Sequence, residues 1–188
     1  GGSQLAADGI AANALLVTNV AAACGGLAWL LIEWFSTNSK PTLIGSASGV
    51  VSGLVGITPA AGYVDVSGAL FIGLGSGLVG YFGVVKLKKW LGYDDTLDVF
   101  GIHGLVGAFG AIATGIFANP VINEGNAGLL YGNPGQVLIQ VQSVIYVSLY
   151  SAFATFIIYK IISLLFGTGR ISEEVEKDGM DMAYHGER

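Results

Sequence analysis

Charged residues are scarce in this sequence. Only 8 Lys or Arg and 13 Asp or Glu occur among 188 residues, so 11% of the chain is charged. A soluble domain of this length needs more charge than that to solvate its surface. Hydrophobic residues make up 53% of the chain, and the mean hydropathy is +0.67. These values exclude an ordinary soluble domain and predict an integral membrane protein in contact with the lipid bilayer.

Residues for covalent and metal chemistry are scarce as well. The single cysteine, Cys24, lies in an apolar run, and we interpret it as a small buried hydrophobe. Two histidines and scattered carboxylates form no metal-ligand spacing, and the sequence contains no Ser-His-Asp order, phosphate loop or nucleotide fingerprint. No basic stripe is available to neutralise phosphates. We therefore predict no enzyme activity, no metal, no cofactor and no nucleic-acid partner.

The apolar residues fall into five stretches separated by polar turns. A membrane-spanning helix needs about 20 residues, so the first stretch is longer than necessary and the second is shorter. We predict an all-α integral membrane protein with five transmembrane helices in residues 1–170 and a cytoplasmic C-terminal tail in residues 171–188. A polar loop at 36–40 follows the first helix. The predicted helices are 5–35, 42–58, 66–85, 98–117 and 137–166.

Proline is rare, with four residues, whereas glycine is abundant, with 30. The glycines show no period of three, which excludes a collagen-like chain. Two of the predicted helices instead carry glycines at helical spacing, which allows another helix backbone to approach closely. These ridges consist of Gly45, Gly49 and Gly53 in the second helix and of Gly73, Gly77 and Gly80 in the third.

Lysine and arginine are absent from two of the predicted loops, those around Tyr63 and Asn126. All eight positive charges lie at the ends of the first, third and fifth helices, which alternate topology places on one side of the membrane. The positive-inside rule predicts that this side is the cytoplasm, so the N-terminal end of the chain lies outside. The eight residues are Lys40, Lys86, Lys88, Lys89, Lys160, Arg170, Lys177 and Arg188.

One ionisable side chain, His103, interrupts the glycine-rich apolar stretch at 98–117. A polar ring in hydrocarbon loses its water hydrogen bonds, so an intramembrane histidine is a functional-site candidate by default. The alternative is a structural histidine that donates a hydrogen bond to a carbonyl or serine of a neighbouring helix. Neutral imidazole both donates and accepts, and it can pass on a proton. On a regular helix its stripe contains Val99, Gly107, Gly110 and Thr114.

Two other polar residues allow two interpretations each. Asp98 lies at the start of the fourth predicted helix, where a cap is favoured over a ligand. Acidic residues at 94, 95 and 98 all suit this position, because negative charge complements the helix dipole. Thr58 precedes Pro59 and either ends its helix or lines a pore.

Two runs of residues carry a family resemblance. They are KPTLIGSASGVVSGLVGITPAAGYVDVSGALFIGLGSG at 40–77 and DDTLDVFGIHGLVGAFGAIATGIFA at 94–118. Both resemble the ammonium transporter family (Amt/Mep/Rh), and the tail EEVEKDGMDMAYHGE resembles the cytoplasmic C-terminus of that family. The similarity covers essentially the whole chain.

The resemblance implies a fold of eleven transmembrane helices, built from two inverted halves of five and a long, tilted last helix. This chain matches the second half only, which agrees with its opening on Gly1 instead of Met. An N-terminal half is therefore expected to be missing. Without it, the chain lacks the first pore histidine, the recruitment-site tryptophan and the phenylalanine gate, and it should not conduct alone.

Four residues receive roles from the resemblance. His103 matches the second histidine of a pore-lining pair, and Val99 matches an apolar wall position near the histidines. Ser3 matches a serine of the outer vestibule that helps to recruit ammonium, and Thr58 matches a threonine near the pore. These residues imply a channel that recruits ammonium outside and conducts ammonia through a hydrophobic pore, while excluding potassium because potassium cannot shed a proton.

The resemblance also implies a homotrimer in the plasma membrane and a P-II signalling protein that closes the cytoplasmic mouth. One alternative is an ammonium sensor or transceptor, in which binding is signalled through the acidic tail with little flux. Another is a purely structural half of a different multispan transporter. A membrane enzyme is the least favoured, because nothing supplies a nucleophile with a base.

Overall fold

The computed structural model describes residues 1–36, 40–167 and 170–186, and all regular structure in these ranges is helical. The predicted all-α class is therefore confirmed. Residues 37–39 of the predicted polar loop and residues 187–188 of the predicted tail lie outside the described ranges. The main helices are α1 (Gly9–Ser36), α2 (Leu43–Ile57), α3 (Val66–Tyr81), α4 (Lys88–Leu91), α5 (Val106–Phe117), α6 (Gly135–Phe166) and α7 (Glu173–Asp178).

Three segments of π-helix occur in the described residues, and one of them, η5 (Asp181–His185), follows α7 in the tail. The segment η2 (Phe82–Leu87) joins α3 to α4, and η3 (Phe100–Leu105) leads into α5. Four helical runs of the described chain are long and apolar enough to cross a membrane, and α2 is a shorter apolar helix. The four runs are Gly9–Ser36, Val66–Leu91, Phe100–Phe117 and Gly135–Phe166.

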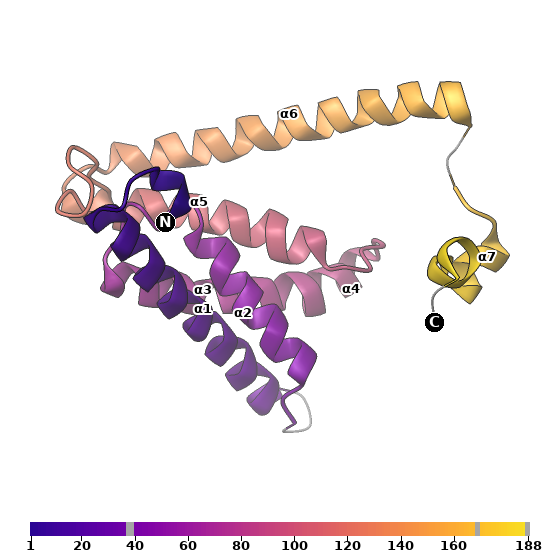
Figure 1. Ribbon diagram of the computed structural model, residues 1–188, viewed down its shortest axis with the longest axis horizontal. Coiled ribbons are helices and arrows are strands. Elements are labelled where there is room, and N and C mark those ends of the chain that lie inside the picture. Colours follow the sequence, from indigo (N-terminus) through magenta and orange to yellow (C-terminus); the bar gives the residue numbers. More distant parts are fainter. Residues whose placement is uncertain (37–39, 168–169, 187–188) are drawn as a thin grey trace. The chain divides into compact units, whose positions relative to one another are not determined.

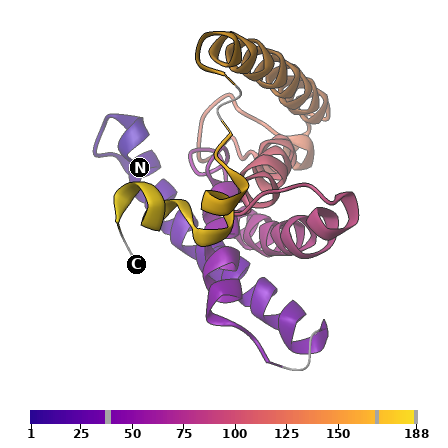
Figure 2. The same cartoon turned by 90° about the vertical axis from the view of Figure 1, so that its right-hand side faces the viewer.

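The chain divides into two compact units, Gly1–Val144 and Ile145–Arg188. In the first unit, α2 contacts α1, α3 and α5, and α1 also contacts α3 (Figure 1). Helices α1 and α2 lie side by side in both views (Figure 1 and Figure 2). A core of small and β-branched side chains fills the space between the helices and consists of Val17, Ala21, Ile57, Ala60, Val64, Ala69, Ile72 and Ala113.

Both predicted glycine ridges pack against neighbouring backbone. A Cβ built on Gly25 of α1 would lie 2.8 Å from the Cα of Gly53, closer than real side chains approach. A Cβ on Gly77 of α3 would lie 2.5 Å from the carbonyl oxygen of Gly25. The close approach of α1, α2 and α3 therefore depends on glycine, as expected from the sequence.

The first unit has two chemically different ends. The turn end contains residues 1–8, 58–65 and 118–134 and has no lysine or arginine. At this end, Asn13 joins α1 to the turn at 58–65, because its Nδ2 donates a hydrogen bond to the Val64 carbonyl at 2.9 Å. The lysine end contains residues 33–36, 40–42 and 82–98 and includes four lysines. There the hydroxyls of Ser36 and Tyr81 lie 3.0 Å apart.

Two predicted helix bounds differ from the structure by more than three residues. The first helix begins at Gly9 instead of Leu5, because Asp8 caps it through the backbone N–H of Ala11 at 3.0 Å. The third helical run continues through the lysines that were expected to end it and reaches Leu91. It stops at Gly92, whose φ of 66° is left-handed and suits glycine.

The second unit contains the rest of α6 and the acidic tail. No residue of α6 is buried within the described structure. In the tail, Ser172 caps α7 through the backbone N–H of Val175 at 3.4 Å. Two exposed ion pairs, Arg170–Glu176 at 3.3 Å and Lys177–Glu173 at 3.4 Å, accompany this helix. Exposed pairs of this kind stabilise a helix only slightly.

Candidate functional site

A pocket of about 380 Å³ lies at the turn end of the first unit and includes two of the predicted site residues, Ser3 and Thr58. These residues come from distant parts of the sequence, and the fold brings them to one cavity. The side chains that line it are mostly neutral hydrogen-bonding groups and small apolar groups. Its other polar lining residues are Gln4, Thr18, Tyr63 and Asn123.

Ser3 is placed by a short turn before α1. Residues Gly2–Gln4 form a 3₁₀ turn that ends at Leu5, which has a left-handed φ of 58°. The Gln4 side-chain amide donates to the Asp8 carboxylate at 2.8 Å. The hydrogen bond from the Ala11 backbone, followed by that from Gln4, lowers the pKa of Asp8 below its ordinary value of 3.8. Asp8 therefore joins the start of the chain to the first turn of α1.

Thr58 is placed by the turn that follows α2. Pro59 has no backbone N–H and cannot continue the helix. The turn after it is closed by the backbone N–H of Ala61, which donates to the Ile57 carbonyl at 2.8 Å. The Thr58 hydroxyl donates to the Leu54 carbonyl at 2.7 Å, so its oxygen still has acceptor capacity. Thr58 therefore ends α2 and lines the pocket, and its place beside a pore stays a prediction.

Asn13 supports this turn and was not among the predicted site residues. Its Nδ2 donates to the carbonyls of Val64 and Ala61, at 2.9 and 3.4 Å. This amide holds α1 against the turn that carries Thr58. The sequence offered one signal, a polar residue within the first apolar run, but the partners of Asn13 lie in a distant segment that only the fold identifies.

His103 and Val99 lie elsewhere, near the lysine end, and neither lines the pocket that contains Ser3 and Thr58. Both side chains are exposed on the first unit. The His103 imidazole makes no hydrogen bond to any described residue, so nothing in this part of the chain shows it joining two helices. The structure therefore brings together two of the four predicted site residues and leaves His103 and Val99 on a separate surface.

The exposure of His103 corrects the regular stripe expected from its spacing. On an uninterrupted α-helix, His103 and Gly110 would share a face, because they are seven residues apart. Gly110 packs directly against the backbone of Gly56 in α2, so a regular helix would bury the imidazole there as well. His103 instead lies in η3, where the wider π-helical turn changes its direction. Gly110 and Thr114 are buried, whereas Val99 and His103 are exposed.

The π-helical segments η2 and η3 contact each other through glycines. A Cβ on Gly83 would lie 2.9 Å from the Cα of Gly101, and a Cβ on Gly101 would lie 3.1 Å from the backbone of Gly83. No side chain fits between these two backbones. This contact fixes the start of η3, and with it the position of the His103 backbone. π-Helical segments of this kind are common at functional sites.

The predicted cap at Asp98 is wrong. Asp95 accepts the backbone N–H groups of Val99 and Phe100, at 2.9 and 2.8 Å, and therefore caps this helix. Asp98 has a left-handed φ of 55°, and its carboxylate accepts from Lys88 Nζ at 2.8 Å. Lys88 also donates to the Asp95 carbonyl. Lys88 thus holds the loop around Asp95 and Asp98 in this conformation, and the helix begins after Asp98.

A second hydrogen-bonded group closes the turn end. The Asn119 side chain is 7% exposed and donates to Asp65 Oδ2 at 3.0 Å and to the Tyr131 hydroxyl at 2.9 Å. Asp65 also caps α3 through the backbone N–H of Gly68 at 3.0 Å. Partial burial of the phenol, followed by the charge of Asp65, raises the pKa of Tyr131 above its ordinary value of 10.0. These residues hold the loop that adjoins the pocket.

The Ser3–Thr58 pocket can accept hydrogen bonds through hydroxyl and amide oxygens, and the Tyr63 ring forms part of its wall. Such a site suits a small solute that donates hydrogen bonds, including a cation that can lie against an aromatic face. No group of three metal-ligating side chains occurs within the residues that the structure describes. The fold and the pocket together define an integral membrane protein with a small polar site at one end of its helices.

The chain belongs to the Ammonium Transporter Family, which it matches over residues 1–188. It is 49% identical to an ammonium transporter of Aquifex aeolicus over 187 residues, which cover 100% of this chain and 43% of that protein. The fold resembles the crystal structure of Saccharomyces cerevisiae Mep2, with a TM-score of 0.82 and 36% identity over 88% of this chain and 38% of that one. It also resembles a sensor Amt protein, with a TM-score of 0.83 and 26% identity over 97% of this chain and 44% of that one.

The chain thus spans less than half the length of these relatives. The family is one of transporters, which agrees with the absence of a catalytic motif from the sequence.

Proposed function

We propose that this chain forms part of an ammonium transporter channel. In this proposal, the pocket that contains Ser3 and Thr58 recruits ammonium, and His103 and Val99 line the path along which ammonia then moves. The observation that carries the proposal is the pocket itself. Ser3, which was predicted to recruit ammonium, and Thr58, which was predicted to lie near the pore, line one cavity of about 380 Å³ although they are distant in sequence.

The chemistry of this pocket suits selection between ammonium and potassium. The two ions have the same charge, so a site that attracts cations by charge alone would bind both. Ammonium donates hydrogen bonds that the Ser3 and Thr58 oxygens can accept, and potassium has no proton to donate. The Tyr63 ring adds a face that favours any cation, so selection comes from the hydrogen bonds.

The surface position of His103 fits a residue that lines a path. Its imidazole has no hydrogen-bond partner among the described residues, so both ring nitrogens are available to ammonia or to a group outside this chain. Val99 lies one helical turn before it and is 51% exposed, which gives the same surface an apolar wall. A dry apolar path rejects an ion that cannot release a proton, whereas ammonium can cross as ammonia.

The whole transporter requires more than this chain in our proposal. A segment that corresponds to the remaining part of the longer relatives supplies the other pore wall and completes an eleven-helix fold. All five apolar helical runs, including α2, then cross the membrane, as residues 9–36, 43–57, 66–91, 100–117 and 135–166, with residues 171–188 as the tail. The turn end, which has no lysine or arginine, faces outside, and the lysine end faces the cytoplasm.

The assembly in this proposal is a homotrimer in the plasma membrane, with a P-II signalling protein that binds at the cytoplasmic mouth. The exposed apolar surface of α6 supports contact with lipid or other helices, because none of its residues is buried within the described structure.

Transport by a chimera tests this function. The chain replaces the matching segment of the Aquifex aeolicus transporter, and uptake of labelled methylammonium is measured in proteoliposomes with potassium as a competitor. We expect His103→Ala to reduce uptake or discrimination against potassium by about tenfold or more, since it removes a polar group from the path. The matched control is His185→Ala, which changes the other histidine, an exposed residue of the tail.

Two results would contradict the pore assignment. Equal uptake and selectivity in the His103 and His185 variants would place His103 outside the path. Loss of folded protein in the His103 variant alone, without a change in transport per folded molecule, would make it a structural residue. The chain alone, reconstituted in the same vesicles, should show no uptake.

An ammonium sensor is the second candidate function. The observation that favours it is the likeness to a sensor Amt protein. In a sensor, ammonium would change the environment of the tail around α7 while flux stays low. A fluorescent label at residue 180 of the chimera reports this change, and a response to ammonium without measurable uptake would favour the sensor.

A further inference from the structure

A second pocket, of about 320 Å³, lies beside the Ser3–Thr58 pocket in the first unit. The end of α5, the loop after it and the first turns of α6 surround it. Pro59 and Tyr63 line both pockets, whereas Ser3 and Thr58 line only the first of the two. The second pocket is thus a separate space that shares one wall with the first.

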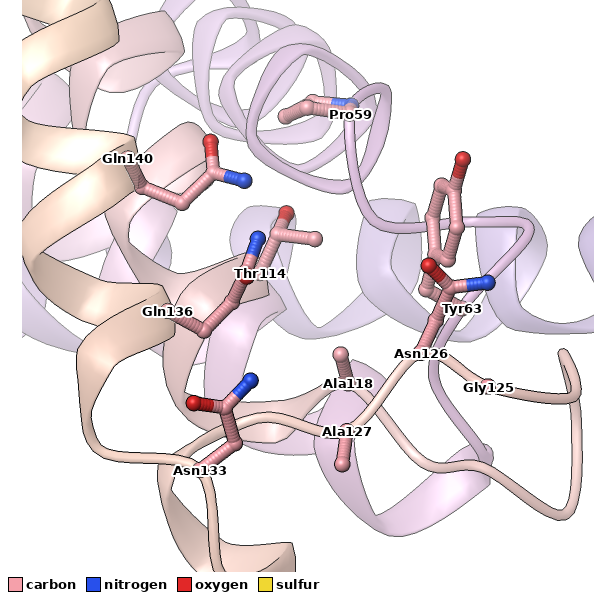
Figure 3. Close-up of a pocket in the computed structure, with 10 residues that line it drawn as sticks. All are labelled: Pro59, Tyr63, Thr114, Ala118, Gly125, Asn126, Ala127, Asn133, Gln136 and Gln140. Atoms are coloured by element: carbon pink, nitrogen blue, oxygen red, sulfur yellow. The ribbon is translucent and has the colours of Figure 1, made fainter.

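The lining of this second pocket is polar but contains no carboxylate, lysine, arginine or histidine. Six of its residues carry neutral hydrogen-bonding side chains: Tyr63, Thr114, Asn126, Asn133, Gln136 and Gln140. Figure 3 shows the amides of Gln136 and Gln140 and the Thr114 hydroxyl pointing into one space, with Tyr63 and Asn126 on the opposite side. A charged ligand would find no opposite charge here.

Several of these groups have unused hydrogen-bonding capacity. The side chains of Asn133, Gln136 and Gln140 make no hydrogen bond to any described residue, and Gln136 and Gln140 are half-buried. Each amide offers two donors and an acceptor oxygen. The Thr114 hydroxyl donates to the Gly110 carbonyl at 2.8 Å and keeps its lone pairs for another donor. Half-buried polar groups without partners favour a ligand that supplies both donors and acceptors.

We propose that this pocket binds an uncharged polyhydroxyl group, such as a sugar. A sugar hydroxyl both donates and accepts, which matches amides that present both functions, and the Tyr63 ring offers a flat face to a sugar ring. The volume is at the small end of the range for ligand pockets and corresponds to about ten water molecules, so it suits a single sugar ring.

The position of the pocket allows two sources for this group. The pocket lies where α5 ends and α6 begins, and both belong to helical runs that are long and apolar enough to cross a membrane. A pocket at the ends of such helices lies near the lipid headgroups. The sugar can therefore come from a glycolipid headgroup or from a free sugar in solution, and the same amides would recognise either.

Binding measurements in nanodiscs test this proposal on the chimera described above, in which this chain replaces the matching segment of the Aquifex aeolicus transporter. One arm uses nanodiscs that contain monoglucosyl diacylglycerol, and the other uses nanodiscs of phosphatidylcholine with free glucose in solution. Native mass spectrometry counts bound glycolipid, and saturation-transfer NMR detects free glucose. We expect saturable binding in at least one arm, with a loss of about tenfold in affinity in the double variant Gln136→Met, Gln140→Met, because two hydrogen-bonding amides are removed.

The matched control is Gln142→Met, which changes an exposed glutamine of the same helix that does not line the pocket. Unchanged binding in this control and weakened binding in the double variant support the proposal. Binding in the lipid arm alone identifies a glycolipid headgroup, and binding in both arms identifies the sugar itself as sufficient. Absence of saturable binding in both arms, or equal losses in the double variant and the control, overturns it. Because no arm measures ammonium, the outcome is independent of the transport proposal.

Discussion

The two ends of the first unit are held together by different chemistry. At the turn end, the amides of Asn13 and Asn119 join segments that are distant in sequence, and no lysine or arginine takes part. At the lysine end, an ion pair between Lys88 and Asp98 binds the loop before His103. The turn end therefore depends on side-chain amides that donate to backbone carbonyls and to the Asp65 carboxylate, whereas the lysine end depends partly on an ion pair that solvent and salt can reach.

This difference has a thermodynamic consequence. The Asn119 amide, which is 7% exposed, is costly to remove, because its partners lose hydrogen bonds in a partly buried site. The ion pair is 30% and 27% exposed at its two side chains, so water and salt screen much of its attraction. The turn end should therefore be the more rigid end, and the lysine end the more responsive to solution conditions.

Asn119→Ala gives the largest expected effect. It removes two hydrogen bonds donated by a side chain that is 7% exposed, and it leaves Asp65 and Tyr131 without this partner. We expect a loss of about 2–4 kcal/mol in the free energy of unfolding, with little dependence on salt. Thermal unfolding in detergent measures it, with Asn19→Ala, at an exposed asparagine that bonds only within its helix, as the control. Equal losses in both variants would refute the comparison.

Asp98→Asn gives a smaller and salt-dependent effect. Asparagine tolerates the left-handed φ of 55°, so this variant removes the charge without forcing the backbone to change. We expect a loss of about 0.5–1 kcal/mol at low salt that disappears at high salt. The control is Asp94→Asn, since Asp94 forms no ion pair in the described structure. A loss that persists at high salt would show that the pair acts through its shape instead of its charge.

Asp8 gives the smallest effect and depends on pH. Its pKa in the folded chain is lowered, chiefly by the hydrogen bond from the Ala11 backbone, so the ionised carboxylate stabilises the fold. This contribution is complete above the unfolded value of 3.8 and is lost as the pH falls through the lower folded value. A carbon-13 titration of Asp8 should show the lowered pKa. The Gln4→Leu variant should raise it part of the way back, and no change would rule out the side-chain contribution.

The sequence was sufficient for features that arise from composition and spacing. Apolar stretches predicted the helices, and glycines at helical spacing predicted that another helix backbone approaches α2 and α3 closely. The fold identifies α1 as that helix. The separate roles of Ser3 and Thr58 came from the family resemblance, since no local pattern connects residues so distant in sequence. The fold then placed both residues in one pocket.

The features that the sequence did not reveal depend on tertiary contacts. Asp94, Asp95 and Asp98 suit a helix cap equally well, and the choice among them depends on where Lys88 lies. The π-helical turn at His103 likewise depends on the contact between Gly83 and Gly101, two glycines in separate helical runs. Local propensity cannot distinguish such cases, because each alternative is locally acceptable.

The π-helical turn of η3 separates the orientation of His103 from the packing of α5, which follows it in the same helical run. Gly110 fixes the packing of α5 on α2, while η3 sets the direction of His103. Because successive residues of a helix are about 100° apart, deleting Gly104 or Leu105, which lie between His103 and Gly110, would turn the imidazole by about that angle relative to Gly110. Insertions and deletions in this short segment therefore provide a way to redirect a single side chain while the core of the bundle keeps its packing.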